Sequence, residues 1–235
     1  MDENSQEMVT ESLEFLSSVS NYNHWMANTL EPYVGQKVVE LGCGIGNILQ
    51  YYLLRKKLIG IDLDPNLINY CKKKFEDHSN CEFICADIFE DDIKLDSNID
   101  TILSMNVIEH IEDDRKALKW MVDNLSLNGS LVILVPAHPL IYGEIDKAAG
   151  HYRRYVMEDL ITKIEGTGCK VTANFYFNCI GFFGWGLNSR LLKKKTIPNK
   201  QTLMYDRYIA PLQAWAEGII HPPFGQSLVV VAHKT

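Results

Sequence analysis

The sequence lacks several features that would each point to a particular class of protein. No apolar run approaches the roughly 20 residues that cross a bilayer, and no repeat, low-complexity tract or Pro/Ser-rich linker divides the chain. The 6 cysteines lie scattered, without CxxC or zinc-ligand spacing, which indicates reduced thiols. The first residues begin acidic and lack the basic start of a secretory signal. We therefore expect a single domain over residues 1–235 in a cytoplasmic protein without a transmembrane segment.

Basic residues are also in the minority, with 23 Lys and Arg against 30 Asp and Glu and a net charge of −7. This balance argues against a nucleic-acid binder. The charge is uneven, because residues 1–146 hold 11 basic and 25 acidic residues, whereas residues 147–235 hold 12 and 5. A basic last third predicts contact with something anionic there. A solvated surface with uneven charge is the alternative.

The chain does contain a regular alternation of short β-branched runs and helical patterns. The runs occupy residues 37–41, 57–62, 81–87, 99–105 and 130–136. The helical patterns between them occupy residues 48–54, 65–75 and 113–125. Unbroken apolar runs suit strands that are buried on both faces. The alternation therefore predicts an α/β fold with a doubly wound parallel sheet.

After residue 136 this rhythm changes. A polar loop over 137–155 is followed by a helix near 156–166, a strand near 169–177 and a closing strand at 227–234. A long segment between two strands is usually a lid or a functional insertion. We interpret residues 178–222 as a helical cap over the carboxyl ends of the strands, in an acceptor-side half spanning 137–235. Residues 36–136 form the core, and 1–35 are expected to form N-terminal helices.

Three glycines follow the first strand, in the stretch Glu40-Leu41-Gly42-Cys43-Gly44-Ile45-Gly46-Asn47. Glycines let the backbone turn sharply and approach a ligand, and we expect a helix to open behind them. A dinucleotide site has the spacing GxGxxG, but Asn47 stands where its third glycine would be. Glu40 would repel a pyrophosphate and suits an ammonium group. Both residues argue against a nicotinamide-dependent dehydrogenase.

Two carboxylates end the next two strands. Asp62 lies twenty residues beyond Gly42, where a carboxylate can accept hydrogen bonds from both hydroxyls of a ribose. Asp87 offers a second carboxylate to an adenine amino group, and Ile88 offers an apolar side chain to the adenine face. These residues describe a site for an adenosine that carries a cationic amino-acid tail and no phosphates.

With these motifs the sequence resembles the class I S-adenosylmethionine-dependent methyltransferases. The resemblance covers residues 36–136, through ELGCGIGN, the acidic end of the second strand, the ADI segment and DTILSMNVIEHI. It implies a mostly parallel, seven-stranded, Rossmann-like sheet that binds S-adenosylmethionine and releases S-adenosylhomocysteine. It implies that Gly42, Gly44 and Gly46 cradle the methionine portion, with Glu40 near its charged end. The resemblance also implies that Asp62 holds the ribose, that Leu63 packs on the adenine and that Asp87 reaches its amino group. Asn106 would line the far side of the cofactor.

A looser likeness extends into the second half. Gly150-His151-Tyr152-Arg153-Arg154-Tyr155 resembles the loop after the fifth strand of small-molecule methyltransferases, including quinone-type O-methyltransferases. GFFGWGLNSRLLKKK is similar to bacterial methyltransferases of glycan or secondary-metabolite pathways. This likeness implies a small-molecule acceptor without naming it.

Methyl transfer to a hydroxyl or a protonated amine also requires removal of a proton, and histidine is the natural base near neutral pH. His151 and His138 flank the loop that should face the sulfonium, and His151 is preferred because an aromatic and basic cluster follows it. A histidine that only hydrogen-bonds the lid is the alternative. His110 is expected to pack behind the helix after the fourth strand, with Glu109 as its partner or as a helix-start charge.

The predicted substrate-binding residues are Tyr22, Trp25, Tyr152, Arg153 and Arg154. The two arginines suit a carboxylate or phosphate on the acceptor. Pairing of one of them with Glu158 or Asp159 a turn later is the alternative. In related enzymes a helix before the first strand covers the cofactor, but an aromatic residue there is more often part of the core.

The cap carries an aromatic stretch, Phe175–Leu187, next to Arg190 and Lys193–Lys195. Three interpretations stay open: a roof over an apolar acceptor, a homodimer contact, or a peripheral membrane patch. The paired acids typical of magnesium-dependent, catechol-type methyltransferases do not follow the fourth strand, so we expect no metal.

These observations predict transfer of a methyl group to an oxygen or nitrogen of a small molecule, anionic or linked to a lipid or glycan. The rival hypothesis is a non-catalytic S-adenosylmethionine-binding partner that regulates or scaffolds a pathway enzyme. Nucleic-acid methylation is disfavoured by the charge and by the lack of a motif of the Asn/Asp-Pro-Pro-Tyr type.

Overall fold

The computed structural model describes residue 15 and residues 18–95, 98–196 and 198–235. The expected N-terminal helices over 1–35 therefore lie partly outside the described residues. Within them, a helix α2 (Ser20–Leu30) and a 3-10 turn η1 (Glu31–Tyr33) precede the first strand.

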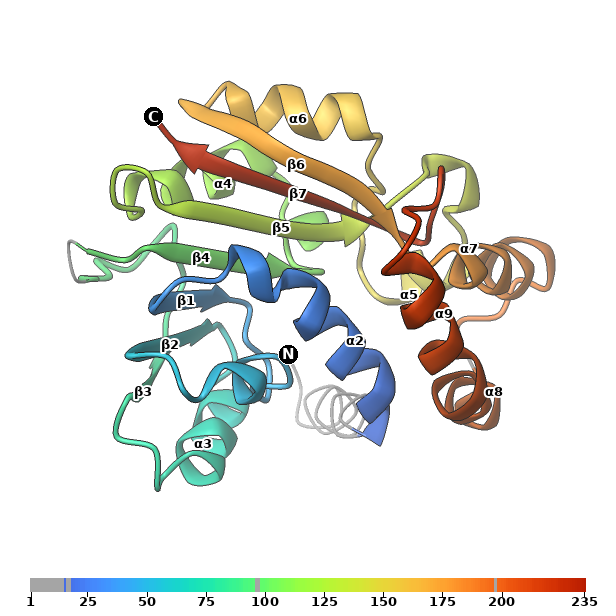
Figure 1. Ribbon diagram of the computed structural model, residues 1–235, viewed down its shortest axis with the longest axis horizontal. Helices are drawn as coiled ribbons and strands as arrows, with labels where there is room; N and C mark the ends of the chain where they lie inside the picture. The colour runs from blue at the N-terminus through green and yellow to red at the C-terminus, as the bar shows by residue number, and fades with distance from the viewer. Residues whose placement is uncertain (1–14, 16–17, 96–97, 197) are drawn as a thin grey trace.

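The centre of the molecule is a seven-stranded sheet with the order β3-β2-β1-β4-β5-β7-β6 (Figure 1). Its strands are β1 (Lys37–Leu41), β2 (Lys57–Asp62), β3 (Cys81–Cys85), β4 (Thr101–Met105), β5 (Ser130–Pro136), β6 (Cys169–Phe177) and β7 (Ser227–Lys234). The strands β1 to β5 pair in parallel, and β7 runs antiparallel to both β5 and β6. This arrangement confirms the predicted fold class. The strand order reverses between β1 and β4, which is where open α/β sheets bind ligands.

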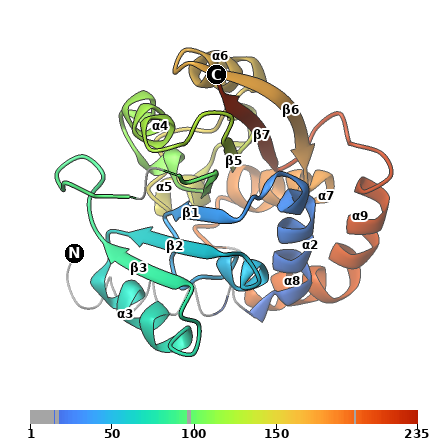
Figure 2. The same cartoon turned by 60° about the vertical axis from the view of Figure 1, so that its left-hand side comes forward.

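Helices cover both faces of the sheet because the strands are apolar on both sides. The helices α2 and α3 (Pro65–Lys74) pack on one face, in a core that includes Leu30, Phe75 and Phe177, and α9 (Ala210–Glu217) packs against α2. The helices α4 (Asp114–Asp123) and α6 (Met157–Glu165) pack on the other face, around Met121 and Leu160. Figure 2 shows α3 and α4 on opposite sides of the strands.

The helix predicted over 48–54 does not form. The chain makes a 3-10 turn, η2 (Leu49–Tyr52). Its backbone hydrogen bonds span three residues, as in the bond from the Tyr51 amide to the Ile48 carbonyl at 3.0 Å. The connection from Gly46 to β2 is too short for a regular helix with a loop at each end. The glycine loop therefore leads into a tight turn, and its amides are not backed by an α-helix.

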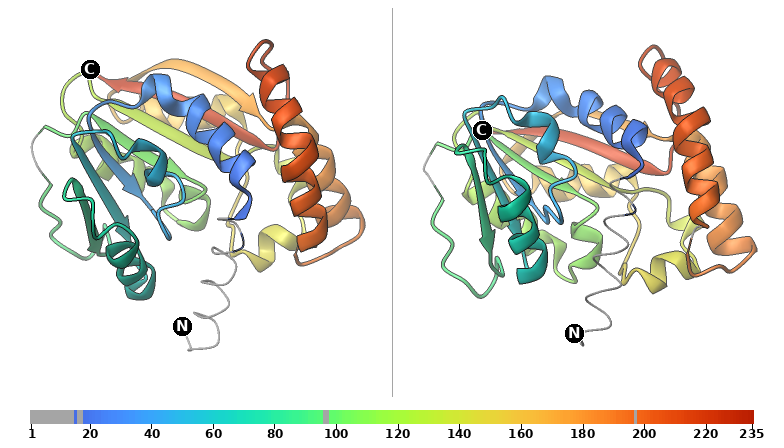
Figure 3. Two further views of the ribbon diagram at one scale, coloured as in Figure 1. Left: turned by 60° about the horizontal axis from the view of Figure 1, so that its bottom comes forward. Right: turned by 90° about the horizontal axis from the view of Figure 1, so that it is seen from below.

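The segment between β6 and β7 is helical. It contains α7 (Cys179–Trp185), a π-helical stretch η5 (Gly186–Leu191), α8 (Asn199–Met204), a second π-helical stretch η6 (Tyr205–Ile209) and α9. These helices, orange to red in Figure 3, stand at one end of the sheet, beyond the carboxyl end of β5. A loop with a 3-10 turn η4 (Pro139–Ile141) and the short helix α5 (Glu144–Ala148) leads from β5 toward them. None of the described helices has the length and apolar character needed to cross a membrane.

Candidate cofactor and acceptor site

The glycine loop after β1 adopts a backbone that only glycine accommodates easily. Gly42, Gly44 and Gly46 have φ angles of 71°, 54° and 71°, in the left-handed region. A Cβ atom on Gly42 would lie 2.3 Å from Cγ2 of Val107, in the segment after β4. The amides of Gly42 and Cys43 both donate to the carbonyl of Ile61 at 2.8 and 3.1 Å. The loop is therefore fixed against β2 and against the segment after β4.

Asp62, at the end of β2, ties this loop in place. One carboxylate oxygen accepts from the Gly44 amide at 2.9 Å, and the other accepts from the Asp64 amide at 3.1 Å. Burial raises the pKa of Asp62, and these amide bonds oppose the shift. Each carboxylate oxygen has a second lone pair, so Asp62 retains capacity for the hydroxyls of a ribose.

Glu40 is a buried carboxylate directly below the glycine loop. Glu40 is 4% exposed, and its Oε2 has no hydrogen-bond partner among the described residues. Burial raises the pKa of Glu40 well above its usual range. Because a buried carboxylate is costly without a cation or a donor, this position fits the ammonium group of a methionine tail.

The remaining predicted cofactor residues lie at the same edge of the sheet. Leu63, after β2, is 66% exposed, as a side chain that packs on a ligand ring would be. Asp87, after β3, accepts from the Phe89 amide at 2.8 Å, and Ile88 beside it is buried. Asn106, after β4, is exposed and has a φ of 54°. Because parallel strands end together, β1 to β4 bring these residues to one edge, and their contacts with the cofactor stay predictions.

On the acceptor side, Asp146 organises the loop after β5. This fully buried carboxylate accepts hydrogen bonds from His151 Nδ1 at 3.0 Å, Arg154 Nε at 2.7 Å and Trp185 Nε1 at 3.0 Å. The Gly143 amide adds a fourth bond at 2.9 Å. Burial opposes ionisation, but these donors and the Arg154 charge lower the pKa of Asp146 to about 2. Sequence reasoning missed Asp146, whose one available signal was its position five residues before His151.

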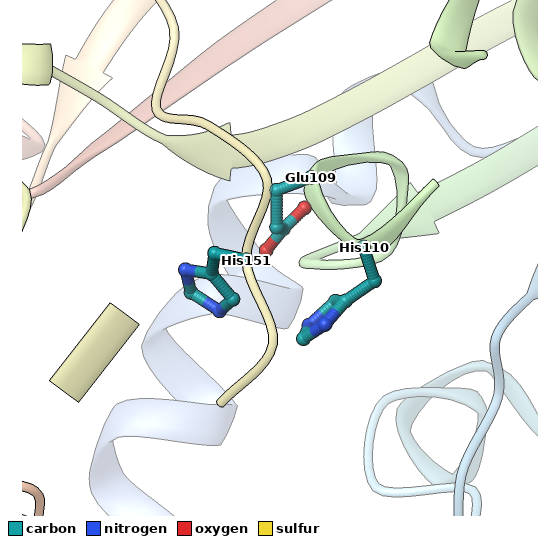
Figure 4. A group of neighbouring side chains, drawn as sticks. All are labelled: Glu109, His110 and His151. Atoms are coloured by element: carbon teal, nitrogen blue, oxygen red, sulfur yellow. The ribbon is translucent and has the colours of Figure 1, made fainter. Parts of the chain in front are cut away.

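Three side chains from two segments converge next to this carboxylate (Figure 4). Glu109 and His110 belong to the 3-10 turn η3 (Ile108–His110) after β4, and His151 belongs to the loop after β5. The rings of His110 and His151 meet edge to face, with centroids 4.6 Å apart. The expectation that His110 packs behind the helix is wrong, because η3 turns its ring outward, where it is exposed and faces His151.

The same environment shifts the ionisation of both residues of η3. Burial raises the pKa of Glu109 to about 8, against the opposing effect of the Arg154 charge. Partial desolvation of the ring, together with the neighbouring His151, lowers the pKa of His110 to about 4. Near neutral pH His110 is therefore uncharged, and Glu109 carries a proton unless a cation compensates its charge.

The two arginines of the loop have partners inside the protein. Arg153 bonds Asp114 at 2.9 Å and the Glu112 carbonyl at 2.7 Å, and Arg154 is buried against Asp146. These contacts replace the pairing with Glu158 or Asp159 that the sequence offered as an alternative. The exposed side chain of Tyr152 lies against the Arg153 guanidinium.

His138, Tyr22 and Trp25 lie among aromatic side chains. The His138 ring stacks on Tyr176 of β6 with centroids 4.8 Å apart. The Trp25 ring packs on Phe177 at 4.1 Å and lines a pocket between α2, β6 and α9, and the Tyr22 ring contacts both at 5.7 to 5.8 Å. Burial raises the pKa of Tyr22 to about 12. Core packing thus accounts for much of both residues, and their substrate roles stay predictions.

Comparison with known proteins agrees with this geometry. Residues 39–133 match a family model described as a methyltransferase domain. Malonyl-[acyl-carrier protein] O-methyltransferase 1 of Ilyobacter polytropus is 23% identical over 207 residues, covering 77% of this chain and 76% of that protein. Phosphoethanolamine N-methyltransferase 1 of Arabidopsis thaliana is 33% identical over 86 residues, which cover 36% of this chain and only 18% of that longer protein.

A solved structure shows the same fold over most of the chain. The N-methyltransferase NodS from Bradyrhizobium japonicum, crystallised with S-adenosyl-L-homocysteine, has a TM-score of 0.58 at 15% identity. The match covers 91% of this chain and 85% of that chain. The matched domain, the sheet order and the cofactor cradle agree with one another. Residues 39–133 are similar to methyltransferase domains, and the chain shares the fold of S-adenosylmethionine-dependent methyltransferases.

Proposed function

We propose that the protein transfers the methyl group of S-adenosylmethionine to an oxygen or nitrogen atom of a small-molecule acceptor. The observation that carries this proposal is the buried Glu40, whose Oε2 has no hydrogen-bond partner among the described residues, beside a left-handed glycine loop that Asp62 holds in place. When bound, the cofactor supplies an electrophilic methyl group on a positively charged sulfur. Glu40 and the loop bind its amino-acid end, and Asp62 orients its ribose. Positioning of this kind supplies much of the rate of an in-line displacement.

The acceptor side is assigned to the loop after β5 and to η3. Asp146 holds His151 through Nδ1, which leaves Nε2 of the ring available toward the neighbouring side chains. This arrangement fixes the ring orientation, as a group that handles the acceptor proton requires. One relative is named for O-methylation and the other for N-methylation, so the comparisons support either acceptor atom.

The surface of the cap supports an anionic acceptor that is linked to a lipid or glycan. Both acidic residues of 178–222, Asp206 and Glu217, are buried, and they accept bonds from the Tyr22 and Asn178 amides at 2.8 and 3.0 Å. The segment also holds the basic residues Arg190, Lys193, Lys195, Lys200 and Arg207 and no exposed acidic residue among those described, although the charges of Lys193 and Lys195 act on Glu144 of α5. Large apolar side chains are exposed beside them: Leu191, Leu212, Trp215 and Ile220 are each more than 70% exposed. A surface of this composition suits the headgroup region of an anionic membrane.

Calorimetric titration with S-adenosylmethionine, S-adenosylhomocysteine and NAD tests the cofactor first. We expect binding of the first two and none of NAD. Asp62→Ala should abolish or strongly weaken binding, whereas Asp92→Ala, which removes an exposed carboxylate in the loop after β3, should not. Binding of NAD alone, or unchanged affinity in Asp62→Ala, would refute the assigned site.

A second experiment tests turnover. The protein is incubated with methyl-labelled S-adenosylmethionine and fractionated small-molecule and lipid extracts, and label in an acceptor is measured. Transfer to an anionic molecule supports the proposal. Cofactor binding without transfer to any fraction, together with a stable hetero-complex, would favour the regulatory or scaffold role instead.

A further inference from the structure

We propose that Glu109, His110 and His151 form a binding site for a divalent first-row transition-metal ion on the acceptor side of the cofactor. Each residue offers one ligand atom, and these atoms all lie within 4.8 Å of one another. Bonds of about 2.1 Å to a shared ion place ligand atoms roughly 3 to 4 Å apart. The ligand atoms therefore need to approach one another by only about an ångström. Figure 4 shows the three side chains grouped together.

The Glu109 carboxylate is the observation that points to a bound cation. The residue is 0% exposed, and neither of its carboxylate oxygens has a hydrogen-bond partner among the described residues. Burying a carboxylate without donors or a counter-charge is costly, so native structures rarely leave one in this state. Arg154, whose charge is felt at Glu109, directs its Nε to Asp146 and its Nη1 to the Ala137 carbonyl. Its buried Nη2 has no hydrogen-bond partner among the described residues, as is the case for the two Glu109 oxygens. A metal ion between Glu109 and the two imidazoles would satisfy these oxygens.

His151 is already oriented as metal-binding histidines usually are. Its Nδ1 donates to Asp146, so Nε2 is the nitrogen left for a metal. Such a carboxylate–histidine–metal arrangement fixes the tautomer and the direction of the ring. Asp146 is itself held by Arg154 and Trp185, so the orientation does not depend on the ion. The His110 ring contacts the His151 ring edge to face, with the two ring centroids 4.6 Å apart.

The ligand types indicate the class of ion. Two imidazoles and one carboxylate suit Zn²⁺, Fe²⁺, Co²⁺ or Mn²⁺ and leave positions open for another ligand. Mg²⁺ and Ca²⁺ prefer oxygen ligands. The sequence predicts no metal because the paired acids of magnesium-dependent methyltransferases are lacking after the fourth strand. It does not bring together His110 and His151, which come from segments after different strands. Only the parallel pairing of β4 with β5 brings their loops together.

The role of this ion rests on the proposed function. The same segment that carries η3 packs against the cofactor loop at Val107 and Gly42, so an ion held by Glu109 and the two histidines would lie near the predicted cofactor site. An ion there would bind the acceptor through its oxygen or nitrogen and lower the pKa of that group, with the proton released to solvent. In this arrangement His151 is a metal ligand, and activation of the acceptor by the ion takes the place of a general base.

Metal binding is tested on the full chain without any acceptor. Protein freed of metal by chelator is titrated with Zn²⁺ by calorimetry and with Co²⁺ by visible absorption. We expect one ion per chain, with at least about 100-fold weaker binding in His110→Ala and in the nearly isosteric Glu109→Gln. His78→Ala, which removes a partly buried histidine in the turn after α3, is the matched control and should bind Zn²⁺ like the wild type.

Three outcomes would overturn the proposal. They are no Zn²⁺ or Co²⁺ binding by the wild type, equal binding in the Glu109 or His110 variants and in the control, or Mg²⁺ binding as tight as that of Zn²⁺. Circular dichroism checks that each variant is folded, and the wild-type titration decides the question if a variant is not. Titration with S-adenosylmethionine on the same samples separates the two proposals, since metal binding does not require the cofactor site to be correct.

Discussion

Replacing Gly42 with alanine should damage both the stability of the fold and the binding of the cofactor. Gly42 has a φ of 71°, and an alanine there would adopt the left-handed region at a cost of roughly 1–2 kcal/mol. The new Cβ would also lie 2.3 Å from Cγ2 and 3.1 Å from Cγ1 of Val107. Overpacking of this kind costs about 1–3 kcal/mol, because the neighbouring side chain must move. The free energy of unfolding should therefore fall by about 2–5 kcal/mol.

Two other glycines separate these contributions. Gly168 has a φ of 92°, but a Cβ atom added there would have no neighbour within 4 Å, so Gly168→Ala should lose only the roughly 1–2 kcal/mol that the backbone conformation costs. Gly184, in α7, has an ordinary φ and open space, so Gly184→Ala should be neutral or more stable by about 0.5–1 kcal/mol. Urea denaturation of the three variants gives the free energies, and calorimetry gives the affinity for S-adenosylmethionine. Equal stability of the Gly42 and Gly184 variants, or wild-type cofactor affinity in Gly42→Ala, would refute this account of the loop.

Other predictions concern the acceptor side. Asp146→Asn leaves the buried Arg154 without its counter-charge and should cost about 3–5 kcal/mol in urea denaturation; a loss below about 1 kcal/mol would contradict this. His151→Ala removes a side chain that serves either as the general base or as a metal ligand, so turnover measured with labelled cofactor should fall about 10²–10⁴-fold, and an unchanged rate would contradict both roles. Burial opposes ionisation of Asp114, but bonds from Lys163, Arg153 and Tyr155 lower its pKa. The Asp114 carboxylate therefore stabilises the fold fully at pH values above its pKa in the unfolded chain, about 4. This stabilisation is lost as the pH falls through the lower pKa of the folded state. The stability gap between wild type and Asp114→Asn should thus stay constant from pH 7 to 5 and narrow below pH 4.

The strands were predictable because burial on both faces leaves a strong local signal. The β-branched runs at 37–41, 57–62 and 130–136 coincide with β1, β2 and β5, whose residues are almost all buried. The helical pattern over 65–75 likewise coincides with α3, which Asp64 caps. The prediction of a helix over 48–54 was wrong because the helix propensity of each residue says nothing about the length of the connection between two strands. The chain closes that connection with a 3-10 turn instead.

The sequence by itself determined the cofactor half of this protein. Its glycine loop and its acidic strand ends each lie within a few residues of a strand, and parallel pairing necessarily brings such ends to one edge. The acceptor half was decided only by tertiary structure. Asp146 and His151 follow β5, whereas Glu109 follows β4, and their contacts depend on how the loop after β5 packs against η3 and α7. Burial and pairing of a charge are properties of the packed environment, so the sequence indicates which residues are present there but not which of them meet.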